Sequence, residues 1–187
     1  MVMKAHTKDR IQEKIHEGLH SFALGELQKS VAHFSEAIRM DPSSHPARMG
    51  RGAAYAKMGK MEDAEADFSM AIESKPKDPR AYHFRGLVRL GRGDRKAAVE
   101  DFSIAIELNP RYGIAYFSRG TARSELGDLD GAGADMAMAA RLGEANLQEF
   151  SDYHNIWRTQ FDKVEAVLLK EREADIAVKP DLTSWLD

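Results

Sequence analysis

Residues 16–20, HEGLH, have the types and spacing of a catalytic motif. In H-E-x-x-H, two histidines one helical turn apart hold zinc, and the glutamate between them activates a water molecule. A zinc hydrolase also needs a third protein ligand and an open coordination position. The extended form of the motif would have glycine at 23 and histidine at 26, where this chain has Ala23 and Glu26. We therefore expect no metal site and no catalysis here, although His16 and His20 could hold an adventitious ion.

The amino-acid composition indicates what kind of protein this is and which kinds of binding partner are excluded. The chain has 187 residues, 43% of them hydrophobic and 30% charged, with a net charge of −3 and no cysteine. This charge gives no basic field for nucleic acid or an anionic membrane, and no apolar run approaches the length of about 18 residues that a membrane span needs. We therefore expect a helical, cytoplasmic protein with no nucleic-acid or membrane partner. A chain that had lost a signal peptide would read in the same way.

Five sets of residues recur with a period of 34 positions. They are Gly18, Gly52, Gly86 and Gly120; Gly25, Gly59, Gly93 and Gly127; Pro42, Pro76 and Pro110; Phe34, Phe68 and Phe102 with Met136; and Ala37, Ala71, Ala105 and Ala139. Five sets in one frame define four repeats. The repeats span residues 11–44, 45–78, 79–112 and 113–144, after a lead-in of residues 1–10.

Each repeat is predicted to be a pair of antiparallel helices. Counted from the start of a repeat, the glycine at position 8 lets the first helix approach the second closely. The glycine at position 15 tolerates the left-handed geometry that ends the first helix. The aromatic residue at position 24 and the alanine at position 27 share one face of the second helix, and the proline at position 32 ends that helix.

The second repeat shows which known family this pattern resembles. Gly52, Tyr55, Ala64, Phe68 and Pro76 match the G-x2-Y…A-x3-F…P pattern of the tetratricopeptide repeat. The resemblance covers residues 11–144. It implies an all-α, right-handed superhelical array, because no single repeat can bury its apolar face alone.

At two further positions of the repeat, 7 and 23, the residue types vary together from one repeat to the next. Arginine at position 7 goes with aspartate at position 23 in three repeats, and glutamate goes with histidine in the first. We therefore expect ion pairs within each repeat rather than between neighbours. The pairs are Arg51–Asp67, Arg85–Asp101, Arg119–Asp135 and Glu17–His33. The alternative is two independent, solvated columns.

The repeat also accounts for the residues of HEGLH. Gly18 is the packing glycine, and Glu17 occupies the charged position 7. His20 and Glu13 stand at positions 10 and 3, where the other repeats carry small apolar residues. The first repeat has no preceding neighbour, so polar groups are expected on its outer face.

The resemblance implies that the first helices line a concave groove, mainly through positions 2, 5, 9 and 12. A contiguous apolar surface of this kind usually marks an interaction site. Alternatively, closure of the array or the C-terminal segment covers these side chains. The predicted groove residues are Ile15, Leu19, Phe22, Met49, Ala53, Arg80, His83, Leu87, Leu90, Ile114, Phe117 and Thr121.

The groove departs from the carboxylate clamp with which members of the family hold the C-termini of heat-shock chaperones. That clamp needs lysine at position 5 and asparagine at position 9 of its first repeat, where this chain has Ile15 and Leu19. Phe84 stands where the third repeat should supply arginine, and only Arg80 is compatible. We therefore expect a different ligand.

After Gly143 the repeat pattern stops, and residues 145–174 carry an apolar stripe with helical spacing. The stripe consists of Phe150, Tyr153, Trp157, Phe161, Val164 and Leu168. We expect a capping helix over the fourth repeat or, as the alternative, a dimerisation helix. Residues 175–187 form a tail, which Trp185 and Leu186 could anchor on the flank of that helix or, in a dimer, in the groove.

Taken together, these features predict a non-catalytic adaptor that needs no cofactor and binds a peptide or helix of another protein in its groove. The alternative is a structural protein that self-assembles into a homo-oligomer through the C-terminal helix or tail. A zinc metalloenzyme acting through HEGLH is the remote alternative.

Overall fold

The computed structural model describes residues 2–143, with side chains from residue 7. Eight helices and no strand follow one another in this part of the chain. They are α1 (Val2–Ala23), α2 (Leu27–Met40), α3 (His45–Lys57), α4 (Met61–Ser74), α5 (Pro79–Gly91), α6 (Arg95–Leu108), α7 (Gly113–Glu125) and α8 (Leu129–Arg141). The predicted helix at 145–174 and the tail at 175–187 lie outside the described residues.

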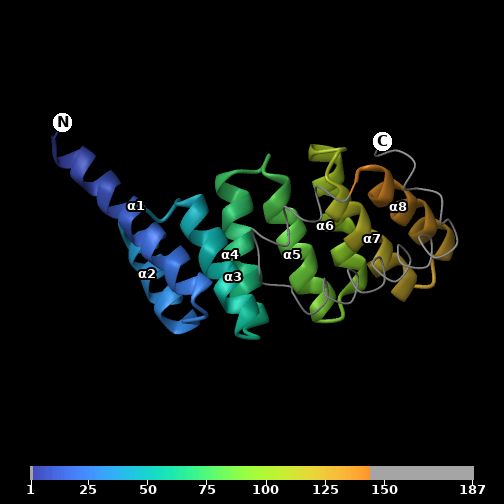
Figure 1. The fold of residues 1–187 in the computed structure, drawn as a ribbon, viewed down its shortest axis with the longest axis horizontal. Coiled ribbons are helices and arrows are strands. Elements are labelled where there is room, and N and C mark those ends of the chain that lie inside the picture. The colour runs from blue at the N-terminus through green and yellow to red at the C-terminus, as the bar shows by residue number, and fades with distance from the viewer. Residues whose placement is uncertain (1, 144–187) are drawn as a thin grey trace, which may run out of the picture.

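The helices form a row of four antiparallel hairpins, each packed on the next (Figure 1). This confirms the predicted all-α repeat array. Residues 2–10, predicted as a lead-in, continue α1 at its N-terminal end and make it longer than the other helices. First helices of adjacent repeats (α1, α3, α5 and α7) approach one another more closely than the second helices do. The row therefore curves, with the first helices on its inner side.

The turn inside each hairpin depends on a glycine, as predicted. Gly59 has a φ of 76°, in the left-handed region that side-chain-bearing residues avoid. The next amide, of Lys60, donates to the carbonyl of Tyr55 at 2.9 Å, which satisfies a carbonyl at the end of α3. Gly25, Gly93 and Gly127 have φ values of 76°, 85° and 84° at the equivalent positions.

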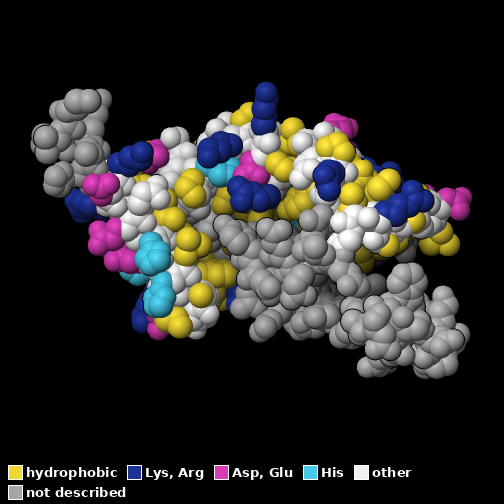
Figure 2. Space-filling model, turned by 45° about the horizontal axis from the view of Figure 1, so that its top comes forward, with side chains coloured by type: hydrophobic (Ala, Val, Ile, Leu, Met, Phe, Trp, Pro, Cys, Tyr) yellow, Lys and Arg dark blue, Asp and Glu magenta, His cyan; other side chains and the backbone are white. Residues whose placement is uncertain are grey.

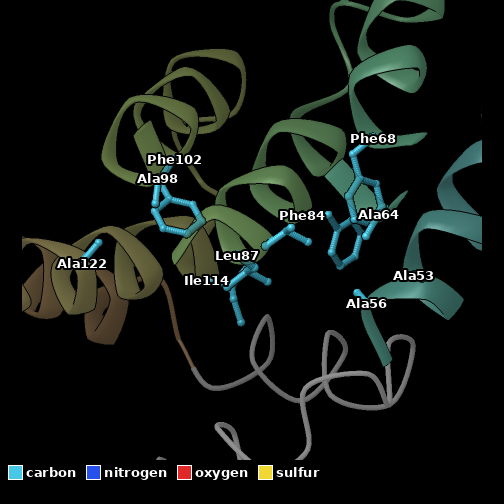
Figure 3. Packing of buried hydrophobic residues seen from close by; sticks show 11 residues of the cluster. Ala53, Ala56, Ala64, Phe68, Phe84, Leu87, Ala98, Phe102, Ile114 and Ala122 are labelled. Carbon is cyan, nitrogen blue, oxygen red and sulfur yellow. The ribbon is translucent and has the colours of Figure 1, made fainter. Parts of the chain in front are cut away.

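Aromatic rings fill the space that the position-8 glycines leave between the two helices of a hairpin. Phe34, Phe68 and Phe102 are completely buried. A Cβ atom on Gly86 would lie 2.6 Å from Cε1 of Phe102, closer than packed atoms come. Phe68 of α4 also stacks on Phe84 of α5, with 5.5 Å between the ring centroids, and thereby joins the second and third repeats (Figure 3).

The predicted ion pairs within the repeats are present. The guanidinium of Arg85 binds Asp101 through Nε (3.0 Å) and Nη2 (2.7 Å). The equivalent pairs are Arg51–Asp67, with a shortest distance of 2.7 Å, and Arg119–Asp135, also 2.7 Å. In the first repeat, His33 Nδ1 lies 3.0 Å from Glu17 Oε2.

Each of these arginines also reaches the preceding repeat, a contact that the sequence columns did not predict. Arg85 Nη1 donates to Ser69 Oγ of α4 at 3.2 Å. Arg51–Ser35 and Arg119–Ser103 repeat this contact at 3.0 and 3.1 Å. One guanidinium therefore connects the two helices of its own repeat to the second helix of the repeat before it. The column of serines ends at Ala137 in the fourth repeat.

A second arginine completes each cluster, and its position differs between repeats. In the third and fourth repeats it stands at position 11, as Arg89 and Arg123, whereas in the second repeat Arg48 stands at position 4. A tyrosine occupies whichever of the two positions lacks arginine. The position-7 arginine lies over that tyrosine ring at 5.6–5.8 Å in all three repeats. The exchange preserves two arginines, one aspartate and one tyrosine in each cluster.

Candidate functional site

The HEGLH residues lie on α1 at the N-terminal end of the array. His16 and His20 are exposed. Glu17 is held by Lys14 Nζ at 2.6 Å as well as by His33. The hydrogen bond from Lys14 and its charge lower the pKa of Glu17, which makes this carboxylate a weaker base. Among the described residues, no group of three or more His, Cys, Asp or Glu is placed to hold a metal ion.

The inner side of the array has a pocket of about 330 Å³ over the first three repeats, here called the α3 pocket. It lies on α3 and is flanked by α1 and α5. Its lining residues are Ile15, Leu19, Phe22, Phe34, His45, Pro46, Met49, Gly50, Ala53, Lys75, Arg80 and Phe84.

The α3 pocket exists because the middle helix carries small residues where its neighbours carry large ones. Position 6 is Gly50 in the second repeat and Phe84 in the third. Gly50 lies directly against the buried ring of Phe34, where an added Cβ atom would collide with the ring, and both residues line the pocket. Leu19 stands at the edge on α1 with 53% of its surface exposed.

The polar side chains that line the α3 pocket are all of basic types: His45, Lys75 and Arg80. Both ring nitrogens of His45 are engaged, with Nδ1 donating to the carbonyl of Ala71 (3.0 Å) and Nε2 lying 2.9 Å from Asp78 Oδ2. Arg80 binds both oxygens of Asp78, with Nη2 at 2.7 Å from Oδ2 and Nε at 3.0 Å from Oδ1. At the opposite end, Lys57 Nζ lies 5.2 Å from the ring centroid of Phe22.

Asp78 connects this basic end to the helix framework. Its side chain accepts from the backbone amide of Arg80 and so caps the N-terminus of α5. Burial acts to raise the pKa of Asp78, but the hydrogen bonds and charge of Arg80 and the hydrogen bond to His45 outweigh it. The pKa is therefore lowered.

Six of the twelve predicted groove residues line the α3 pocket. They are Ile15, Leu19, Phe22, Met49, Ala53 and Arg80. In the space-filling view, hydrophobic side chains lie next to lysine and arginine side chains over this N-terminal part of the array (Figure 2).

The other six residues lie further along the array and are less available. Leu87 and Ile114 belong to the buried core, and Leu90 packs against it. Phe117 and Thr121 are partly buried on α7. His83 is completely buried, with its ring beside Phe102 and Tyr112 and its Nε2 atom 3.0 Å from Ser118 Oγ. In this structure His83 is a packing residue of the core rather than a residue of the groove surface.

Several residues of the α3 pocket were not among the predicted ones. Gly50 stands where the next repeat has an aromatic residue, and this difference between repeats could have indicated a pocket at Gly50. His45 and Lys75 carry no such signal, because they stand at the turns between repeats and reach the pocket only through the stacking of the repeats.

Known proteins share this sequence pattern and this fold. A family model described as "Tetratricopeptide repeat" matches residues 17–79 and 85–146. The structure resembles two crystal structures of MamA: one with TM-score 0.70 at 15% identity, covering 95% of this chain and 96% of that one, and one with TM-score 0.69 at 22% identity, covering 79% and 85%. No curated protein matches the chain.

A third similar structure contains a ligand. It is described as the first TPR of Spaghetti (RPAP3) bound to the HSP90 peptide SRMEEVD, with TM-score 0.62 at 21% identity, covering 64% of this chain and 94% of that one. At these identities the resemblances show the fold. Within the described part of the chain, no helix is long and apolar enough to cross a membrane.

Proposed function

Since the chain belongs to the tetratricopeptide repeat family, we propose that it is a non-catalytic adaptor and that its α3 pocket binds a segment of another protein. The observation that carries the proposal is the pocket itself, an apolar cavity of about 330 Å³ on the inner side of a helical array. Cavities of about 300–1,000 Å³ are the usual size of binding pockets. A pocket of this size accepts one or two large side chains of an incoming segment.

The framework around the pocket supports binding without rearrangement. The lining residues on α1, α3 and α5 stand on helices that are held by buried rings, and ion-pair clusters join α3 to α4 and α5 to α6. A preorganised site avoids the entropy cost of ordering itself when its ligand arrives. The peptide bound to the first TPR of Spaghetti supports the idea that this fold can hold a segment of another protein.

The pocket chemistry defines the ligand class. Large apolar side chains would fill the space above Gly50, and acidic groups would lie near Lys75 and Arg80. Helix-in-groove recognition, in which an amphipathic helix inserts apolar side chains at i, i+3 and i+4, meets both demands.

Affinity capture with the full chain tests this proposal when two matched variants are compared. Leu19→Glu puts a charge at the edge of the pocket, whereas Leu126→Glu puts the same charge on a leucine with 43% exposure at the turn after α7. Both sites face solvent, so neither variant should unfold. We expect a partner that the wild type and Leu126→Glu retain and that Leu19→Glu loses.

Calorimetric titration of the captured partner then gives the affinities directly. We expect Leu19→Glu to weaken binding at least tenfold, equivalent to about 1.4 kcal/mol. Equal affinity of the wild type and Leu19→Glu would contradict binding at the α3 pocket.

A further inference from the structure

We propose that, before a partner binds, the α3 pocket is occupied by the chain's own residues 148–168, which a partner must displace. The inference rests on the proposed function in one respect: it takes a binding partner as the molecule that competes with this segment for the α3 pocket. Self-occupation of the pocket can be measured in the protein alone.

The first argument is chemical complementarity. The pocket combines large apolar side chains with Lys75 and with Arg80, whose guanidinium also binds Asp78, and no acidic residue lines it within the described part of the chain. A suitable occupant therefore has bulky apolar side chains on one face and carries carboxylates beside them.

Residues 148–168 have this chemistry. Their apolar stripe has spacings of three and four residues, as one face of a helix requires, and it contains four aromatic residues. Glu149, Asp152, Asp162 and Glu165 accompany the stripe, against two basic residues, Arg158 and Lys163. The segment is therefore apolar on one side and net acidic.

The second argument is reach. In each repeat, the second helix ends at the edge of the array where the turns between repeats lie. The C-terminal end of α8 therefore lies on the same edge as His45, Lys75 and Arg80. At about 8–10 Å per step, the three steps from α8 to α7, from α7 to α5 and from α5 to α3 cover roughly 24–30 Å. The 14 residues from Gly143 to Trp157 span about 21 Å as helix. Fully extended they span about 46 Å, so Trp157 can reach the pocket within one chain.

The third argument concerns the competing site, the outer face of α8. The second helices of the first and third repeats pack the buried Ile38 and Ile106 under the following repeat, whereas α8 has Ala140 at the equivalent position. Gly133, Ala137 and Ala140 leave most of this face exposed with small side chains, and Leu129 at the start of α8 is its one strongly exposed large side chain among the described residues. We expect the aromatic stripe to bury more apolar surface in the α3 pocket than on this face, and burial scales with stabilisation.

The test uses the full chain and its own fluorescence. Trp157 and Trp185 are the only tryptophans, so Trp185→Phe leaves Trp157 as a single reporter within the stripe. In this background we expect blue-shifted emission and weak acrylamide quenching. Leu19→Glu should shift the emission to the red and increase the quenching constant several-fold, whereas Ala140→Glu on α8 should change neither.

A second pair of variants examines the charge argument. Lys75→Glu should act like Leu19→Glu, whereas Lys77→Glu, at an exposed lysine outside the α3 pocket, should not. Circular dichroism during thermal unfolding confirms that the variants are folded.

Three results would overturn the inference. The first is solvent-exposed Trp157 in the protein without Leu19→Glu. The second is a response to Ala140→Glu, which would place the segment on α8. The third is emission that depends on protein concentration together with a dimer mass by light scattering, which would place the segment in a second copy. Failure of the partner-binding test leaves these fluorescence results unaffected, so the two proposals fail separately.

Discussion

At the scale of single residues, the buried aspartates determine how neighbouring helices are joined. Asp101 is 1% exposed and accepts hydrogen bonds from both Arg85 and Arg89, while Arg85 also reaches Ser69. Carboxylate–guanidinium hydrogen bonds are strong and directional, so they fix the register of the helices. A buried pair adds stability only while both partners are present.

Replacing Asp101 by asparagine should therefore destabilise the protein. The amide has one acceptor oxygen in place of two and cannot accept all three guanidinium hydrogen bonds, which leaves buried hydrogen-bond donors poorly satisfied. We expect a loss of about 2–4 kcal/mol in the free energy of unfolding. Urea denaturation measures it, with the exposed neighbour Glu100→Gln as control. Equal stability of the two variants would show that the clusters are dispensable.

Asp78 gives the array a defined dependence on pH. Its pKa is lower in the folded protein than the value of about 3.9 for an unfolded chain. The stabilisation is therefore present above about pH 4 and is lost as the pH falls through the folded pKa. Asp78→Asn keeps a good helix cap but removes the charge, and it should cost about 1 kcal/mol near pH 7.

The stability difference between wild type and Asp78→Asn should shrink as the pH falls from about 5 to 2. Thermal unfolding at several pH values measures this difference. A constant difference across that range would mean that the charge of Asp78 contributes nothing to folding.

The residue-level predictions from sequence succeeded where two columns vary together. Arginine–aspartate in three repeats and glutamate–histidine in one indicated the pairing within repeats, which the structure confirms. The serine contacts were missed because they depend on how adjacent repeats stack, and a single repeat carries no signal of that register. The burial of His83 was missed for the same reason, since its partner Ser118 belongs to the next repeat.

At the scale of the elements, substitution by alanine should have opposite effects on stability at two helical glycines. Gly86→Ala would press a methyl group against Phe102, so it should destabilise by about 1–3 kcal/mol. On α8, a methyl group added at Gly133 would meet no atom within 4 Å, and Gly133→Ala should stabilise by about 0.5–1 kcal/mol. Thermal unfolding distinguishes them, and a Gly86→Ala variant as stable as the wild type would contradict the packing described for Phe102.

The boundaries of the elements followed from their local chemistry. Glycines at position 15 end the first helices, and the second helices of the first three repeats end two residues before the prolines at position 32. The continuation of α1 back to Val2 was not predicted, because no repeat column extends before residue 11.

At the scale of the whole molecule, the inner side of the array is uneven. The α3 pocket lies over the first three repeats, whereas further along the row Leu87 and Ile114 are part of the core. Of the twelve predicted groove residues, which stand at four positions of the repeat, six line the α3 pocket and six lie further along the row. Gly50 contributes to this difference, because the next repeat has the large Phe84 at the same position.

Site-specific photocrosslinking tests most directly whether the protein is an adaptor that binds through this pocket. Leu19 and, as control, Leu126 are replaced in turn by a benzophenone-bearing amino acid in the full chain, and each protein is irradiated with the captured partner. Only position 19 lies on the α3 pocket, so it should form the covalent adduct with the partner. An adduct from position 126 with none from position 19 would contradict the account.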